Sequence, residues 1–333
     1  MPNRDNKTDV SRAAASTFDA DMRERLLGGH PIREGAYTLP TPMMQRTYAL
    51  VRELVWARRT GTVFYSSPRM GKTRCALAIR DLLRAEFPNI YVTLLSTRPS
   101  GRPTTSHMLR LILEAESHVL SRRPDPNLLF GNAVADIRVK AGRIGAKQYV
   151  LLIDEMQLLN DADLQQLVCF HNELELQNLK MTAISFAQPE ILHRRTSLLA
   201  NNARQIIGRF LSDTLQFDGC CSEGDFGDLL RCYDLASEFP EGSGITFTQF
   251  FFPAAYRAGF RLETYRTALW DALHRAAGSI AEQGVPMEHI CLTIEDLLLS
   301  LRRQDHCGFH IDENDIDAAV SASKLRSFSD VLN

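Results

Sequence analysis

The sequence contains no long apolar run, no CxxC pair and no strong excess of one charge. No apolar stretch in its 333 residues approaches the ~20 residues that a membrane-spanning helix needs, so we expect neither a transmembrane protein nor a membrane partner. The N-terminal segment mixes acids and bases and lacks the apolar core of a secretory signal, which predicts a cytoplasmic protein. Seven cysteines, an odd number, argue against a disulfide framework.

The charge of the chain is small but unevenly distributed. A net charge of -2 excludes a uniformly basic nucleic-acid binder, and 44% hydrophobic residues are typical of a globular protein. Residues 98–147 carry nine Lys and Arg against four Asp and Glu, whereas residues 219–333 carry nine against eighteen. The basic segment is suited to contact DNA, with solvated helix faces as the alternative interpretation.

One group of residues near the C-terminus has the side chains of a metal site. It consists of His289, Cys291, His306, Cys307 and His310. The spacing of the last two histidines would place both imidazoles on one side of a helix. Because a glycine lies between them and no tight cysteine pair accompanies them, we favour scattered residues over a zinc site.

Short apolar runs alternate with helical patterns in the first two thirds of the chain, which predicts an α/β fold with a parallel five-stranded sheet covered by helices. The expected strands are 62–66, 90–95, 149–153, 181–186 and 214–217. The expected helices are 43–59, 72–86, 104–121, 128–142, 162–177 and 189–200. Residues 1–36 lack periodicity and read as a flexible arm, with a short helix around 17–27.

From residue 219 onward no strong strand pattern occurs, which predicts a C-terminal all-α lid domain and tail over 219–333. Helical patterns cover 223–236, 247–258, 262–282, 294–303 and 312–323. Thr293 precedes Ile294 and two acids, which predicts a hydroxyl-capped helix start.

The segment 62–73 has the order of a phosphate-binding loop, with a strand, a turn and a helix that begins at Gly71-Lys72-Thr73. Gly71 lets the backbone N–H groups and the helix N-terminus face phosphates. Lys72 supplies a charge for the β- and γ-phosphates, and the Thr73 hydroxyl is a ligand for Mg²⁺. ATP and Mg²⁺ are therefore the expected cofactors.

The loop itself departs from the usual pattern in one place. Ser66 occupies the position of the first glycine. The residues expected to line the phosphates are Ser67, Pro68, Arg69 and Met70. A surface Gly-Lys turn is the alternative, and the flanking strand and helix argue against it.

A second motif follows 82 residues later, where the apolar strand 149–153 ends in Asp154 and Glu155. Ligands bind at the carboxyl ends of parallel strands, so these acids are expected beside the phosphates. Asp154 would hold Mg²⁺, and Glu155 would act as general base toward water. An acidic helix cap is the alternative interpretation.

Three further residues are candidates for the same site. Gln188 follows the next strand, where a residue that senses the γ-phosphate belongs, although an exposed loop glutamine has the same sequence pattern. Arg209 precedes the fifth strand, and in ring-forming ATPases such an arginine reaches into the neighbouring subunit. Arg261 opens a lid helix and could reach the nucleotide. A surface ion pair and a water-facing arginine are the alternatives.

These motifs resemble the AAA+ ATPases and, more narrowly, the TnsC/TniB group of bacterial transposition regulators. The resemblance covers about residues 37–300. It rests on YTLPTP, GKT at 71–73, LLIDEMQLL at 151–159, AISFAQPE, IIGRFL at 206–211 and AGFR at 258–261. The DEMQ segment is the more specific part. The resemblance implies that residues 37–218 form an ATPase domain that hydrolyses ATP.

The resemblance also implies partners. Such regulators assemble as rings or filaments on double-stranded DNA and link a TniQ-like target-selection protein to a transposase. Phosphate contacts would then come from Arg98 and Arg102 in the loop 96–107, which is otherwise a flexible Pro/Ser loop. The alternatives are a nucleotide-bound scaffold with little hydrolysis and another DNA-dependent AAA+ loader.

Overall fold

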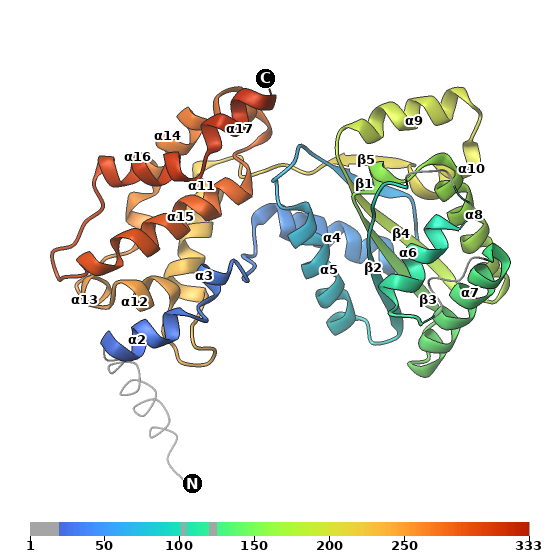
Figure 1. Ribbon diagram of the computed structural model, residues 1–333, viewed down its shortest axis with the longest axis horizontal. Coiled ribbons are helices and arrows are strands. Elements are labelled where there is room, and N and C mark those ends of the chain that lie inside the picture. The colour runs from blue at the N-terminus through green and yellow to red at the C-terminus, as the bar shows by residue number, and fades with distance from the viewer. Residues whose placement is uncertain (1–19, 101–103, 105, 120–124, 333) are drawn as a thin grey trace, which may run out of the picture. The chain divides into compact units, whose positions relative to one another are not determined.

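The computed structural model describes residues 20–100, 104, 106–119 and 125–332, and these form two compact units (Figure 1). The sheet unit is Met43–Phe217. The helical unit combines Asp218–Asn333 with the described part of Met1–Pro42. The predicted ATPase domain of 37–218 therefore differs from the sheet unit chiefly at its start.

All five predicted strands are present and parallel, which confirms the α/β fold. Their order across the sheet is β2-β3-β4-β1-β5. The strands are β1 (Thr62–Tyr65), β2 (Ile90–Ser96), β3 (Gln148–Asp154), β4 (Lys180–Ala187) and β5 (Asp213–Gln216). Every residue of β3 is buried, as a central parallel strand requires, whereas β5 is an exposed edge strand. The carboxyl ends of β1, β3 and β4 are thus neighbours.

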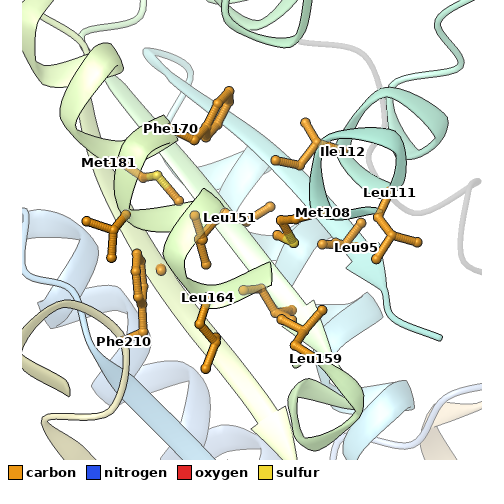
Figure 2. Close-up of a cluster of buried hydrophobic side chains, with 14 of the residues drawn as sticks. Leu95, Met108, Leu111, Ile112, Leu151, Leu159, Leu164, Phe170, Met181 and Phe210 are labelled. Carbon is orange, nitrogen blue, oxygen red and sulfur yellow. The ribbon is translucent and has the colours of Figure 1, made fainter. Parts of the chain in front are cut away.

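Helices cover both faces of the sheet (Figure 1). They are α4 (Pro42–Trp56), α5 (Lys72–Glu86), α6 (His107–Ala115), α7 (Pro126–Arg143), the 3₁₀ turn η1 (Met156–Leu158), α8 (Asp161–Leu176), α9 (Glu190–Ala200) and α10 (Arg204–Phe210). Figure 2 shows α6 and α8 side chains such as Met108, Ile112 and Leu164 against Leu151 and Met181 of the strands. This dry layer fixes one face of the sheet.

The helical unit contains short helices around an aromatic core. It comprises α2 (Ala20–Leu27), α3 (Pro31–Glu34), α11 (Glu223–Arg231), η2 (Cys232–Ala236), α12 (Phe247–Phe251), α13 (Pro253–Arg257), η3 (Leu262–Tyr265), α14 (Arg266–Ala277), η4 (Gly278–Gln283), α15 (Met287–Leu301), η5 (Arg302–Gln304), α16 (Glu313–Ala322) and α17 (Leu325–Leu332). The all-α C-terminal region is therefore confirmed.

The segment before residue 37, predicted as a flexible arm, packs against this core from Leu26 onward. His30 is fully buried, with its ring centroid 4.5–4.9 Å from those of four phenylalanines, and its Nδ1 accepts a hydrogen bond from the backbone of Ile32. Tyr37 donates to Glu295 and meets the Tyr233 hydroxyl, each at 2.8 Å. Residues 1–19 of the predicted arm lie outside the described residues.

The helix boundary at Thr293 was predicted wrongly. α15 begins at Met287, directly after Pro286, and runs past Thr293 without interruption. The Thr293 hydroxyl donates back to the His289 carbonyl at 2.8 Å, an alternative to capping that a buried mid-helix threonine commonly adopts. Near the C-terminus, Leu325 of α17 is buried and Ser329 donates to the Ala277 carbonyl. This tail belongs to the helical unit.

Among the described residues, no helix is long and apolar enough to cross a membrane. The same part of the chain contains no group of three or more His, Cys, Asp or Glu side chains arranged to hold a metal ion. Of the histidines considered for zinc, His289 is buried with Nδ1 at 2.8 Å from the Ser323 carbonyl, and His306 Nδ1 accepts from the backbone of Gly308.

Candidate functional site

The predicted phosphate-binding loop connects β1 to α5. Two residues of the loop have left-handed backbone conformations, Arg69 with φ +67° and Gly71 with φ +104°. The first helical residue, Lys72, follows directly. Met70 is buried and anchors the loop to the core. No side chain caps the start of the 15-residue helix α5 at Gly71, and the N-terminus of a helix at the end of such a loop is the arrangement that phosphate sites use.

Lys72 is the buried cation of this loop. Its Nζ donates to the carbonyl of Ser66 at 2.8 Å, to the Ser66 hydroxyl at 3.1 Å and to the Ser67 carbonyl at 2.9 Å. Burial lowers the pKa of Lys72, and the nearby carboxylates of Asp154 and Glu155 oppose that shift. The loop therefore satisfies the ammonium group with acceptors that phosphate oxygens can replace.

Asp154 lies at the end of β3, and its Oδ2 accepts the Thr73 hydroxyl at 2.7 Å. Burial raises the pKa of Asp154, while the hydrogen bond from Thr73 opposes the rise. A hydroxyl and a carboxylate at this distance are oxygen ligands of the kind that Mg²⁺ takes alongside phosphates. The residues present thus fit a bound Mg²⁺-nucleotide, with Thr73 and Asp154 as the metal-side groups.

Glu155 has φ +58°, an unusual backbone conformation for a residue with a side chain. Its Oε2 accepts the side-chain amide of Gln188 at 3.0 Å and that of Gln157. Gln157 Oε1 in turn accepts the Gln188 backbone N–H at 3.0 Å. The structure brings the predicted Glu155 and Gln188 together and adds Gln157, which the sequence analysis did not single out, although it closes the DEMQ segment.

Arg209 lies on α10, directly before the edge strand β5. Its Nη2 donates to the Asn172 side-chain carbonyl at 3.0 Å. Arg261 belongs to the helical unit, where its Nη1 donates to the carbonyls of Tyr256 and Phe260 and its guanidinium lies 3.5 Å from the centroid of the Tyr256 ring. Their predicted roles toward a nucleotide stay predictions.

Of the two arginines expected to contact DNA, the structure describes one. Arg98 is exposed and forms an ion pair with Glu114 at 2.6 Å. Arg102 lies outside the described residues. A DNA phosphate would have to compete with Glu114 for Arg98.

Comparison with known proteins agrees with this geometry. Residues 58–195 match the family described as AAA domain, a span that begins just after α4, ends within α9 and contains the loop, the acids and Gln188. No curated protein sequence matches the chain.

Two solved structures share the fold at low sequence identity. The ORC2 protein of Aeropyrum pernix, in ADPNP and ADP complexes, is 11% identical with a TM-score of 0.59, over 89% of this chain and 72% of that one. A chain of Drosophila ORC bound to poly(dA/dT) DNA and Cdc6 is 9% identical with a TM-score of 0.51, over 92% of this chain and 44% of that one. This chain therefore has the AAA+ fold, and the match to the AAA domain family lies within its sheet unit.

Proposed function

We propose that this chain is an ATP-hydrolysing AAA+ switch that acts on double-stranded DNA. The observation that carries the proposal is the carboxyl edge of the sheet, where a buried lysine, a Thr–Asp pair and a glutamate come together. Nothing else in the described residues combines a phosphate cradle with a general base. The complexes of Aeropyrum ORC2 with ADPNP and ADP support a nucleotide as the ligand.

In this proposal Lys72 exchanges its loop acceptors for oxygens of the β- and γ-phosphates. Thr73 and Asp154 would hold Mg²⁺, and the bound ion would supply Lewis-acid stabilisation of the phosphate charge. Glu155 takes a proton from the attacking water as the water oxygen bonds to the γ-phosphorus and the bond to the ADP oxygen breaks. Gln188 orients these groups. Arg209 from a neighbouring subunit and Arg261 of the helical unit stabilise the phosphate charge.

The action on DNA rests on weaker support. The basic segment 98–147 and the fold shared with a chain of DNA-bound Drosophila ORC favour duplex DNA. Arg98 and Arg102 would contact backbone phosphates, which makes binding tolerant of sequence and sensitive to salt.

Two finer functions follow from different observations. The DEMQ and IIGRFL segments favour a TnsC/TniB-like regulator that forms a ring or filament on DNA and links a TniQ-like protein to a transposase. The likeness to ORC favours a loader in the initiation of replication. Negative-stain electron microscopy with duplex DNA and a slowly hydrolysed ATP analogue, followed by binding assays with a transposase, distinguishes them. Stable filaments that retain the transposase support the first.

Phosphate release and fluorescence anisotropy of a labelled duplex test the shared proposal. We expect Lys72→Ala to lose ATP-dependent duplex binding, and Glu155→Gln to bind DNA with only a small residual turnover. Lys180→Ala is the matched control, because Lys180 is an exposed lysine outside the basic segment, at the opposite end of β4 from Gln188. Equal duplex binding with and without nucleotide would contradict the switch, and nucleotide-dependent binding without phosphate release would indicate a scaffold.

A further inference from the structure

Three polar side chains connect the ends of β3 and β4. Gln157 lies in η1, two residues after Glu155, and Gln188 directly follows β4. Both amide groups donate to the same carboxylate oxygen, Glu155 Oε2. All three side chains are partly buried, so water competes less for these hydrogen bonds than it would at the surface.

Gln157 makes a second contact that the Gln188 side chain does not make. Its Oε1 accepts the backbone N–H of Gln188 at 3.0 Å, so one amide group contacts both the carboxylate and the backbone at the tip of β4. If the tip of β4 moves, the Gln188 N–H moves Gln157 Oε1 with it. The Nε2 atom of the same amide group, which donates to Glu155, then moves as well. Gln157 thus connects Gln188, the residue expected beside the γ-phosphate, to Glu155, the proposed base.

The backbone around Glu155 is held by other contacts. The Thr97 hydroxyl donates to the Glu155 carbonyl at 2.6 Å, and the Leu158 N–H donates to the same oxygen at 2.9 Å. With the backbone fixed, the direction of the carboxylate depends on its amide donors. Because both donors use Oε2, Oε1 is the oxygen left for a water molecule.

We infer that Gln157 is a positioning residue that couples the tip of β4 to the Glu155 carboxylate and leaves Oε1 to accept the proton of the attacking water. This inference rests on the proposed ATP hydrolysis. It assigns no contact between Gln157 and the nucleotide. Gln157 therefore controls the rate of the chemical step and not the affinity for ATP.

Kinetics of three variants test the inference. Gln157→Ala removes both contacts, whereas Gln157→Glu keeps the acceptor for the Gln188 N–H and replaces the donor. We expect both to lower kcat about tenfold to a hundredfold, with KM and the Kd for ATP within about twofold of wild type. Gln165→Ala, at an exposed glutamine on α8, is the control and should leave kcat unchanged. A kcat of Gln157→Ala within about twofold of wild type would overturn the inference.

A double-mutant cycle with Glu155→Gln shows whether Gln157 acts through the base. In that background, Gln157→Ala should not lower the residual hydrolysis further. An undiminished effect would overturn the coupling.

A readout without nucleotide keeps the test separate from the proposed function. In protein labelled with ¹³C at the glutamate Cδ, the Glu155 resonance, assigned with Glu155→Gln, should move in Gln157→Ala and stay in Gln165→Ala. An unmoved resonance overturns the inference even if the wild type hydrolyses ATP. Absence of hydrolysis by the wild type contradicts the proposed function alone.

Discussion

The two units each contain a buried aspartate, and the pair differ in what surrounds the carboxylate. Asp154 of the sheet unit accepts one hydroxyl, from Thr73, and one adjacent backbone N–H. Asp234 of the helical unit accepts the Thr248 hydroxyl and the backbone N–H groups of Leu262 and Glu263, at 2.7–3.0 Å. Burial raises the pKa of both.

The two aspartates differ in which of their hydrogen-bond donors a ligand can displace. The Thr73 hydroxyl can rotate toward a metal ion, and Lys72 stands nearby to balance the charge of Asp154. The two backbone donors of Asp234 are fixed by the turn that starts η3, so no ligand can replace them without unfolding that turn. Under the proposed function, similar burial therefore accompanies opposite roles, with a metal-binding aspartate in one unit and a structural aspartate in the other.

Asp154→Asn and Asp234→Asn should separate these roles most strongly. We expect Asp154→Asn to lower hydrolysis by ~10³-fold because the metal loses a charged ligand. We expect Asp234→Asn to lower the free energy of unfolding by about 1–3 kcal/mol, because its amide group faces a backbone donor, and to change hydrolysis by less than about tenfold. Phosphate release measures the first effect.

Urea unfolding followed by tryptophan fluorescence measures the second effect. Trp270 packs on Phe226 in the helical unit, whereas Trp56 of the sheet unit is 78% exposed, so the signal reports mainly on the helical unit. Far-UV circular dichroism, to which the helices of both units contribute, covers the sheet unit as well. If it showed Asp154→Asn destabilising the protein as much as Asp234→Asn does, the distinction between site and scaffold would be lost.

Acid should weaken the helical unit through His30. Burial lowers the pKa of His30 from 6.5 to about 4, so the native state favours the neutral ring. The stability that this provides is complete above pH 6.5 and is lost as the pH falls toward 4, by about 3 kcal/mol. Asp234 acts in the opposite direction, because a raised native pKa favours the folded state as the pH falls.

His30→Asn isolates the histidine contribution. Asparagine can still cap α3, as His30 does through Nδ1, but it does not titrate. Between pH 7 and pH 4, the difference in unfolding free energy between wild type and variant should shrink by about 3 kcal/mol, the effect predicted for titration of the His30 ring. A difference independent of pH would show that His30 contributes no titration.

The smallest expected effect concerns Ser66. Its hydroxyl is one of three acceptors that Lys72 must leave to bind phosphate. Ser66→Gly should therefore tighten ATP binding about threefold to tenfold, or ~1 kcal/mol, in a titration with a fluorescent ATP analogue. Ser66→Ala should reproduce the gain, because the hydroxyl and not the Cβ is responsible. Weaker binding by both variants would mean that the hydroxyl supports the loop.

The sheet unit was largely predictable from the sequence because its signals are local. Buried parallel strands read as apolar runs, and Gly71-Lys72-Thr73 fixes the turn into α5 through residues that adjoin in the chain. The glycine that Ser66 replaces is not required by the backbone, since Ser66 does not adopt a positive φ. This departure from the motif therefore leaves the geometry of the loop intact.

The features that the sequence did not predict depend on contacts between distant segments. Gln157 contacts Gln188 only because β3 and β4 are neighbours in the sheet, which no local pattern encodes. His30 and Tyr37 belong to a segment without periodicity, and their burial is decided by aromatic side chains about 200 residues later. Thr293 has the residue type of a cap, and tertiary packing placed it in mid-helix instead.

The discontinuous helical unit has a consequence for the newly made chain. Ile32 and Leu39 are synthesised well before Leu325, and all three belong to one buried core. At ribosomal speed the residues between them take roughly 15 to 60 s to appear, long after β1 and β4 can pair. During that interval Ile32 and Leu39 lack part of the core that buries them in the folded protein. Proteases and chaperones therefore have access to this segment before the core is complete.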